Sequence, residues 1–338
     1  MQRSTLPFLL IILLLLLGMT AKGQDMHFFH YHSIGPLLSP AEAGQSEGKY
    51  RFTGGYRSQW ASVSKPFVST HFSFDGKTRV LKGKAGMGWG ATVLQDKAGD
   101  ADYGSTGVLL HLSLRIPLVD QHTLIAGASG GIMERSFDRS KLYFDEQYNG
   151  NTFDPGISAL DVSGSPTHPY PDLAFGLTYM YRREWQRFQK FGWVVHHPHR
   201  PQLSHFEDPA ATLQSRWTLY HSASYLLRPD LFIQPGALLM KQGTHYEVLV
   251  GAWISRYYTQ AFPERITLDA GLFTRAGDAL ILGIGGSHSG WNAAMSYEIN
   301  YSGLKAASAW RGGWELSLGY QLHRLAPALT HKAGCLIL

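Results

Sequence analysis

The sequence predicts an all-β protein: a transmembrane antiparallel β-barrel of about fourteen strands, preceded by a short N-terminal segment that is not a strand. Three observations lead to this prediction. Segments of about ten residues alternate between apolar and polar side chains, as strands with two different faces do. The composition is poor in charge and rich in aromatic residues and glycine. An export leader is followed by no second long apolar run.

The clearest alternation is in the last predicted hairpin, Trp291–Tyr301 and Trp314–Leu322. One face of each strand carries Trp, Tyr, Leu, Ile, Met and Ala, and the other face is mostly polar. A strand of about ten residues is long enough to cross a bilayer at a tilt. Aromatic residues lie near both ends of the apolar faces, as membrane-interface girdles do. The polar face predicts lumen-facing positions at Asn292, Ser296, Glu298, Asn300, Glu315, Ser317 and Gln321.

The overall composition narrows the class of protein. Only 16% of the 338 residues are charged, 13% are aromatic and 37 are glycine, whereas about 25% of a typical soluble domain is charged. These values suit a membrane barrel and also a secreted β-sandwich. The net charge of +5 is spread along the chain without a dense Lys/Arg cluster, so no nucleic-acid partner is expected.

The N-terminal residues predict export of the protein. Residues 1–23 read as a signal peptide, with Arg3, an apolar core at Pro7–Leu17 and a small-x-small cleavage site ending at Gly23. No later stretch approaches the roughly 18 apolar residues of a spanning helix. Residues 323–338 form a C-terminal tail of unassigned role, and its Cys335 is the single cysteine, so no internal disulfide is expected.

Residues 24–48 form the predicted non-strand segment. Gly35, Pro36 and Pro40 favour a turning or extended backbone, and the neighbouring aromatic side chains need cover. We expect this segment to pack at the periplasmic mouth of the barrel or inside its lumen.

The barrel itself is predicted to occupy residues 49–322. Arg115 lies among alternating aliphatic residues, so it is expected to face a wet lumen or an interface. The predicted strands are Lys49–Trp60, Phe67–Phe74, Ala85–Leu94, Gly107–Ile116, Thr123–Phe137, Leu173–Tyr181, Phe188–Val195, Gln214–Leu226, Leu231–Lys241, Tyr246–Ile254, Arg265–Thr274, Ala279–Gly286, Trp291–Tyr301 and Trp314–Leu322.

Connection lengths test this assignment independently, because bacterial outer-membrane barrels have short periplasmic turns and long external loops. In the middle of the chain the lengths alternate as expected for a periplasmic N-terminus. The rule fails elsewhere: Asp75–Lys84 and Ser255–Glu264 are long for periplasmic turns, and Gln242–His245 is short for an external loop. The longest predicted loop, Asp138–Asp172, is either a solvated loop or a place for recognition or constriction.

No catalytic, cofactor or metal site is expected. The histidines near His197 and near His30 lie in predicted coil without a closed ligand set. The sequence Gly127–Gly131 matches the G-x-S-x-G pattern around Ser129, but it lies inside a predicted strand rather than at a strand-to-helix turn. Small residues that allow close backbone approach in a barrel strand explain it better.

Several motifs in order resemble one known family. Gln24-Asp25 opens an aromatic and polar stretch, Leu37–Gly44 reads LLSPAEAG, and a strand ends in Tyr56–Trp60, YRSQW. These resemble the QDPQFSQY-like, NPAYAG-like and YRNQW-like segments of the PorP/SprF family of type IX secretion membrane proteins from Bacteroidetes. Ser39 stands where that family usually has Asn, and Glu42 where it usually has Tyr. Further matches are the Gly88-Trp89-Gly90 strand and its loop to Val108, Ser140–Leu142, Pro171–Gly176, Gly277–Leu280, Tyr297–Ile299, Ser302–Leu304 and Glu315–Tyr320.

The resemblance spans Gln24–Leu322 and implies a function. It implies a non-enzymatic barrel in the outer membrane of a Gram-negative, Bacteroidetes-like cell, with type IX secretion and gliding components and secreted surface adhesins as partners. Such a barrel helps to export large adhesin-like substrates or retain them on the cell surface. The alternative is a passive channel or transporter for a small solute. Tyr56, Arg57, Gln59 and Trp60 are expected either to form an interfacial girdle, with Arg57 at the lipid headgroups, or to dock partners.

Overall fold

The computed structural model describes residues 25–80, 85–154, 156, 167–184, 187–204, 208, 210–259, 266–303 and 305–322. The predicted signal peptide (1–23) and C-terminal tail (323–338, with Cys335) lie outside these residues. Among the described residues, no helix is long and apolar enough to span a membrane.

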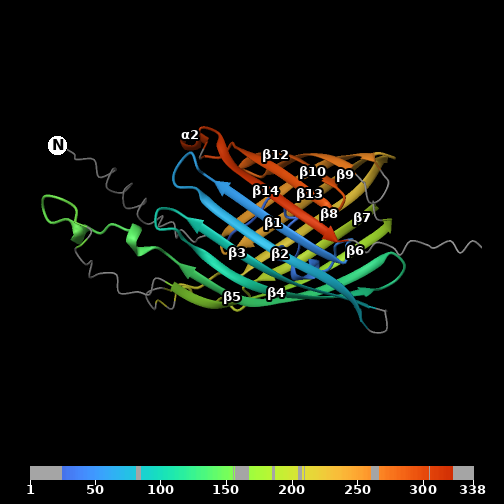
Figure 1. The fold of residues 1–338 in the computed structure, drawn as a ribbon, viewed down its shortest axis with the longest axis horizontal. Coiled ribbons are helices and arrows are strands. Elements are labelled where there is room, and N and C mark those ends of the chain that lie inside the picture. The colour runs from blue at the N-terminus through green and yellow to red at the C-terminus, as the bar shows by residue number, and fades with distance from the viewer. Residues whose placement is uncertain are drawn as a thin grey trace, which may run out of the picture.

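Fourteen strands within the described ranges close into one antiparallel barrel (Figure 1), which confirms the predicted fold class. The strands are β1 (Tyr50–Gln59), β2 (Phe67–Val80), β3 (Ala85–Ala98), β4 (Tyr103–Pro117), β5 (His122–Ser136), β6 (Thr167–Glu184), β7 (Arg187–His196), β8 (Arg216–Arg228), β9 (Leu231–Gln242), β10 (His245–Thr259), β11 (Ile266–Arg275), β12 (Ala279–His288), β13 (Trp291–Asn300) and β14 (Arg311–Leu322).

Each strand pairs with its neighbours in sequence, and β14 pairs with β1 to close the barrel. In that closing register Tyr50 lies opposite Leu322, and Arg57 lies opposite Glu315. The closing hairpin of β13 and β14 therefore joins the first strand, as its position in the sequence predicts. Full closure leaves no unpaired sheet edge, which is the condition for a sheet to span a bilayer.

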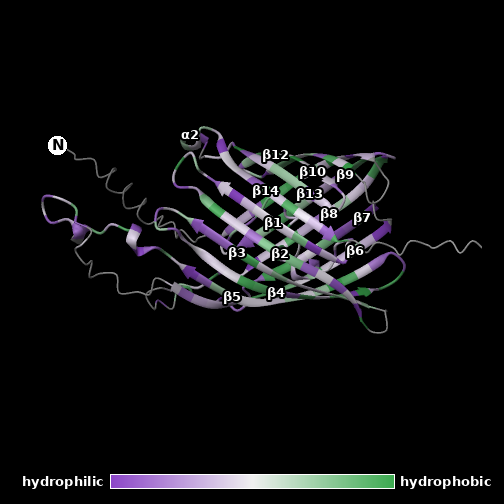
Figure 2. Ribbon diagram, in the orientation of Figure 1, coloured by the Kyte–Doolittle hydropathy of each residue, from purple (hydrophilic) through white to green (hydrophobic). Residues whose placement is uncertain are grey.

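The outward faces of the strands are apolar, as the alternation predicts. On β4 the side chains of Val108, Leu110 and Leu112 are 48%, 62% and 59% exposed, while His111 and Ser113 between them are buried. On β14 Leu316 and Leu318 point outward and Glu315 and Ser317 inward. Hydrophobic residues accordingly alternate with hydrophilic ones along the barrel wall (Figure 2). An exposed apolar wall of this kind is stable only in contact with lipid.

The strands are longer than the sequence pattern indicates, and this corrects the loop assignment. β2 continues to Val80 and β10 to Thr259, so the described parts of the predicted long connections 75–84 and 255–264 are strand. β6 begins at Thr167, inside the predicted loop Asp138–Asp172. The alternation fades in the added parts of β2 and β10 because outward positions such as Gly76, Thr78 and Arg256 are not apolar. The β9–β10 connection is short, as the sequence indicates.

The two ends of the barrel differ. We call the end that carries the β5–β6 loop, with its 3₁₀ turns η4 (Arg139–Lys141) and η5 (Asp145–Gln147), and the short helix α2 (Lys305–Ser308) the long-loop end. Both features project from the left of Figure 1. The opposite end, where β1 begins, is the short-turn end. Long loops lie outside the cell in outer-membrane barrels, so the short-turn end corresponds to the periplasmic side.

Candidate functional site

The N-terminal segment, residues 25–48, runs through the barrel lumen from one end to the other. Its first backbone N–H, on Asp25, donates to Gln242 at the long-loop end of β9, over 2.9 Å. Its last, on Gly48, donates to Gln321 near the short-turn end of β14, over 3.2 Å. The segment is therefore a luminal plug, and we use this name for residues 25–48 below.

Local sequence explains why the plug turns instead of forming a strand. Gly35 has φ +52°, a left-handed conformation that glycine adopts without strain. It opens the 3₁₀ turn η1 (Gly35–Leu37), and Pro40 opens a second, η2 (Pro40–Glu42). The side chain of Ser39 caps η2 by accepting from the backbone N–H of Ala41. These turns shorten the chain so that it fits in the lumen.

The barrel wall carries glycine where the plug comes closest. A Cβ placed on Gly127 of β5 would lie 2.3 Å from the backbone nitrogen of Ala41, and one on Gly88 of β3 would lie 2.0 Å from the carbonyl oxygen of Ala43. Both distances are far below van der Waals contact. Gly127 belongs to the G-x-S-x-G match, which lies within strand β5. The glycine there makes room for the plug backbone.

The long-loop half of the plug packs through apolar side chains. Phe28, Phe29, Tyr31, Ile34 and Leu38 form one buried cluster with the wall residues Val194, Tyr220, Leu238, Leu249, Trp253, Phe273 and Ile281. The ring centroids of Phe29 and Phe273 are 5.0 Å apart in an edge-to-face arrangement, which is a favourable geometry for aromatic pairs. This packing gives the lumen a protein core instead of a water-filled channel.

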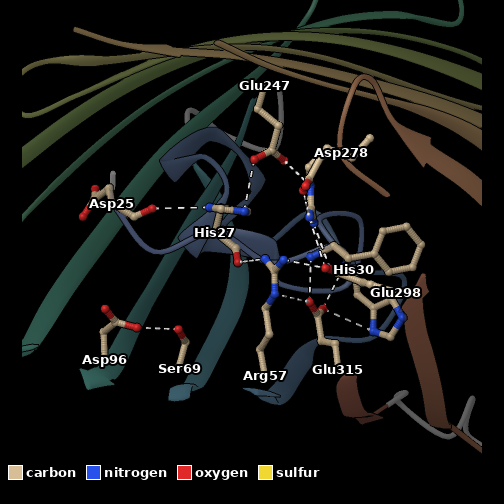
Figure 3. Close-up of polar contacts among 12 residues, drawn as sticks. Asp25, His27, His30, Arg57, Ser69, Asp96, Glu247, Asp278, Glu298 and Glu315 are labelled. Atoms are coloured by element: carbon tan, nitrogen blue, oxygen red, sulfur yellow. Dashed lines mark hydrogen bonds and ion pairs between the residues drawn. The ribbon is translucent and has the colours of Figure 1, made fainter. Parts of the chain in front are cut away.

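A buried charge cluster crosses the closing seam beside Phe29 (Figure 3). Arg57 of β1 and Arg275 of β11 both bind Glu298 of β13, over 2.8 and 2.9 Å. Arg57 also donates to the backbone carbonyl of His27. The carboxylate of Glu315 accepts the backbone N–H groups of Phe29 and His30 over 2.7 and 2.8 Å. Wall charges thus bind the plug backbone directly.

Two histidines of the plug are held neutral in this cluster. Burial, followed in size by the charge of Arg57, lowers the pKa of His30 from 6.5 to about 3. Burial also lowers the pKa of His27 to about 4, although Glu247, 3.1 Å from its Nε2, acts in the opposite direction. Neutral imidazoles leave the two arginines as the cations that balance the carboxylates.

A second cluster holds the start of the plug at the long-loop end. The imidazole of His197 lies between two carboxylates, 2.7 Å from Asp25 and 2.6 Å from Asp172. Arg216 lies 3.2 Å from the same oxygen of Asp25. Burial alone would lower the pKa of His197, but Asp25 and Asp172 outweigh it and raise the pKa to about 9. Burial would raise the pKa of Asp25, but His197 and Arg216 hold it well below its usual range.

A third cluster holds the middle of the plug. Glu42 accepts from Lys190 of β7 over 2.6 Å and from the hydroxyl of Tyr220 of β8 over 2.9 Å. The same hydroxyl lies 2.7 Å from Thr178. Burial would raise the pKa of Glu42, but Lys190 and Tyr220 lower it overall. Two ion-pair clusters and one set of hydrogen bonds from charged wall residues to the backbone therefore fix the plug along the lumen.

Among the pockets beside the plug, two lie along its apolar half and its middle. One, with an empty volume of about 680 Å³, is lined by Asp25, Met26 and His27 of the plug and by His197 and Arg216 of the wall, among others. The other, of about 620 Å³, lies between Tyr31, Glu42 and Lys190.

The structure places all seven predicted lumen positions on the inner face. Ser296, Glu298, Asn300, Glu315 and Ser317 are buried, and Asn292 and Gln321 are half-buried. They do not line an open water channel. Glu298 binds Arg57, and Glu315 accepts from the plug backbone at His30. Gln321 accepts from the backbone N–H of Gly48.

The prediction that Arg57 lies at the lipid headgroups is wrong, and the four residues Tyr56, Arg57, Gln59 and Trp60 do not share one face. Arg57 is 1% exposed and points into the lumen, not toward lipid headgroups. Tyr56 points outward and stacks on Trp314 with ring centroids 4.9 Å apart. Gln59 shares the inward side of Arg57, and Trp60, beyond the end of β1, packs against Phe67. Successive strand residues face opposite sides, so one surface cannot contain them all.

Sequence reasoning missed most of the plug's partners. Asp172, Lys190, His197, Arg216, Glu247 and Arg275 were not selected, and neither were Asp25 and Glu42 of the plug itself. A usable signal was present, because Lys190, Glu247 and Arg275 are charged residues within strands, on the side opposite to the apolar neighbours. Such charges need partners inside a filled lumen. Within the described residues no group of three or more His, Cys, Asp or Glu side chains could hold a metal ion.

A comparison with family models decides the relationship. The model described as "Type IX secretion system membrane protein PorP/SprF" matches residues 20–320. The chain belongs to the PorP/SprF family. No curated protein matches this family member's sequence.

One solved structure with a TM-score above 0.5 supports the barrel fold, and two others are similar at lower scores. A FadL homologue from Pseudomonas aeruginosa is 12% identical, with a TM-score of 0.52, over 86% of this PorP/SprF chain and 94% of the other. The monoaromatic hydrocarbon channel CymD is 10% identical, with a TM-score of 0.48, over 86% and 93%. The toluene transporter TodX from P. putida is 10% identical, with a TM-score of 0.45, over 85% and 93%. At such identities the likeness concerns the fold alone. The PorP/SprF match and the barrel indicate an outer-membrane protein of the type IX secretion system.

Proposed function

We propose that this protein is a non-enzymatic, sealed barrel of the type IX secretion machinery that helps to export large adhesin-like substrates or retain them on the cell surface. The observation that carries the proposal is the filled lumen, in which the plug is bound to the wall by two ion-pair clusters and by the hydrogen bonds of Arg57 and Glu315 to its backbone. A filled lumen suits a scaffold that presents its rims and loops to partner proteins. Family membership supports secretion as the process.

A sealed barrel also accounts for the buried charges. Ion pairs buried away from water are costly to break, because the remaining partner becomes an unpaired buried charge. Removing the plug from the lumen therefore carries a high free-energy cost. A solute channel would instead keep its polar wall residues hydrated.

The second candidate, a passive channel or transporter for a small solute, rests on the two cavities beside the plug. Movement of a solute would require the plug to leave its ionic contacts. The cavities are lined by plug residues themselves, so a solute bound there would contact the plug as well as the wall.

The test uses a strain from which the gene is deleted, complemented with the wild-type chain. We expect deletion to reduce surface adhesins while nutrient uptake stays normal, and the tagged wild-type protein to co-purify with secretion components. The matched complementing variants are Glu298→Gln, which removes the carboxylate that positions Arg57 against the plug carbonyl of His27, and Glu134→Gln, which removes an exposed carboxylate from β5. Only the strain that carries Glu298→Gln should show reduced surface adhesins. Normal adhesins together with impaired uptake would overturn the proposal in favour of the channel.

A further inference from the structure

Three inward-pointing cations share the short-turn mouth of the barrel, away from the clusters that hold the plug. Lys77 of β2, Arg115 of β4 and Arg182 of β6 line one open pocket with an empty volume of about 740 Å³. Their inward direction follows from alternation: Leu114 and Ile116 beside Arg115 are exposed on the lipid side, and Met180, two residues before Arg182, is buried on the lumen side.

The plug completes this pocket. Gln45, Ser46 and Glu47, near the plug's end, form the rest of the lining with Met180. Lys77 holds this part of the plug, because its Nζ donates to the backbone carbonyls of Ser46 and Glu47 over 2.5 and 3.1 Å. The position of the plug thus fixes the shape of the pocket.

The two arginines are not neutralised within the described residues. No described carboxylate lies within salt-bridge distance of Arg115 or Arg182, in contrast to Arg57, Arg275 and Arg216 deeper in the lumen. The Nε of Arg182 is buried and makes no hydrogen bond to any described residue. Three cations and the single carboxylate of Glu47 give the lining a net charge of +2. Like charges held together without a counter-charge repel one another, and a bound anion removes that cost.

The chemistry of the lining identifies the anion. Guanidinium groups present several N–H donors in a planar fork that matches the oxygens of phosphate and carboxylate groups. The side chains of Gln45 and Ser46 can add neutral donors. A phosphate monoester carries a charge of about −1.5 to −2 near neutral pH, which matches the +2 of the lining better than a single carboxylate does.

We propose that this mouth pocket binds a dianionic phosphoryl group, through Arg115, Arg182 and Lys77, on the periplasmic side of the barrel. The group belongs either to free phosphate or to a phosphomonoester lipid headgroup of the facing leaflet. This site is independent of the role proposed above for the sealed barrel. The bound ligand would contact the plug directly, because residues 45–47 of the plug line the same pocket.

The test measures binding of inorganic phosphate to the full chain in nanodiscs of phosphatidylcholine by titration calorimetry. Arg182→Gln should weaken binding about tenfold or more, since it removes a charge-assisted contact. The matched control is Arg183→Gln, which removes the same charge from the next residue, whose side chain is exposed on the outward side of β6. Arg183→Gln should bind phosphate as the wild type does.

Three results would overturn the proposal. They are an equal loss in Arg182→Gln and Arg183→Gln, acetate binding as tightly as phosphate, and no phosphate binding by a wild-type protein that is folded by its thermal transition. Nanodiscs containing phosphatidic acid then separate the two sources. A lipid headgroup in the pocket lowers the apparent affinity for inorganic phosphate, whereas a site for free phosphate keeps its affinity.

Discussion

The arginines of the lumen differ in whether a carboxylate pairs with them. Toward the long-loop end, Arg57, Arg216 and Arg275 each bind a carboxylate, and the plug supplies part of every cluster. At the short-turn mouth, Arg115 and Arg182 have no carboxylate partner among the described residues. Paired charges along the lumen, including Arg51 with Asp75 and Lys190 with Glu42, hold the plug in place. The two unpaired arginines at the short-turn mouth are available to a ligand. Function is therefore expected at the rims and mouth, and stability where the charges are paired.

The largest effect is expected from breaking the buried charge cluster of Arg57, Arg275 and Glu298. Glu298→Gln leaves Arg57 and Arg275 buried without their shared carboxylate. Breaking a buried ion pair from one side costs about 3–5 kcal/mol, so the free energy of unfolding in detergent should fall by that amount. Urea titration followed by tryptophan fluorescence measures it. Glu134→Gln, at an exposed position, should change stability by no more than about 0.5 kcal/mol; similar losses in both variants would show that the central pairing is not special.

The next effect depends on pH and on His197. The pKa of His197 is about 9 in the folded protein and about 6.5 in an unfolded chain. A raised folded pKa means that its stabilising contribution is complete below pH 6.5 and is lost as the pH rises through about 9. The contribution is about 3 kcal/mol as an order of magnitude. Comparing the unfolding free energy of wild type and His197→Gln from pH 6 to pH 10 should therefore give a difference that shrinks as pH rises. A difference independent of pH would mean that His197 is not charged in its contacts with Asp25 and Asp172.

A smaller effect is expected where the plug backbone touches the wall. Gly127→Ala places a Cβ against the backbone nitrogen of Ala41, and overpacking of this kind typically costs about 1–3 kcal/mol. The plug should become more accessible to added protease as well. The control is Gly54→Ala on β1, where the nearest atom to a new Cβ is 3.7 Å away. Equal protease sensitivity in the two variants would argue against close plug packing at β5.

The smallest effect is expected on the lipid-facing wall. Tyr56 stacks on Trp314 across the closing seam, and an aromatic pair contributes about 0.5–1.5 kcal/mol beyond its buried area. In a double-mutant cycle, Tyr56→Leu and Trp314→Leu should show a coupling in that range, measured by unfolding in detergent. The same cycle applied to Arg57 and Glu298 should give a larger coupling, and the reverse order would contradict the view that the lumen dominates stability.

The sequence predicts the outer face of this barrel well and the inner face poorly. Alternation along β4 and β14 identifies the lipid side, because every outward residue meets the same apolar environment. Inward residues contact different partners at each position along the barrel axis, so no single pattern describes them. The partner of Arg57, Glu298, is 241 residues away in sequence, and their contact depends on closure of β14 onto β1. Closure itself is predictable, so charged residues on the inward side of the closing strands were a usable signal for this cluster.

The plug is only partly predictable. Prolines and Gly35 mark residues 24–48 as non-strand, and the aromatic residues indicate that the segment needs cover. Its direction through the lumen depends on the contacts of Asp25 with His197 and Arg216. Those residues follow β7 and begin β8, and no local pattern relates them to the plug. The corrected placement of Arg57 has the same origin, since an arginine beside Tyr56 and Trp60 resembles an interfacial residue until the parity of β1 is fixed.

Single-channel conductance of the purified full-length protein in planar bilayers tests the central claim most directly. With the plug bound along the whole lumen, the wild-type protein should show no steady conductance. Glu298→Gln should open channels in part of the population, because Arg57 loses the carboxylate that holds it against the plug carbonyl of His27. A large, steady conductance of the wild-type protein, equal to that of Glu298→Gln, would contradict a sealed barrel.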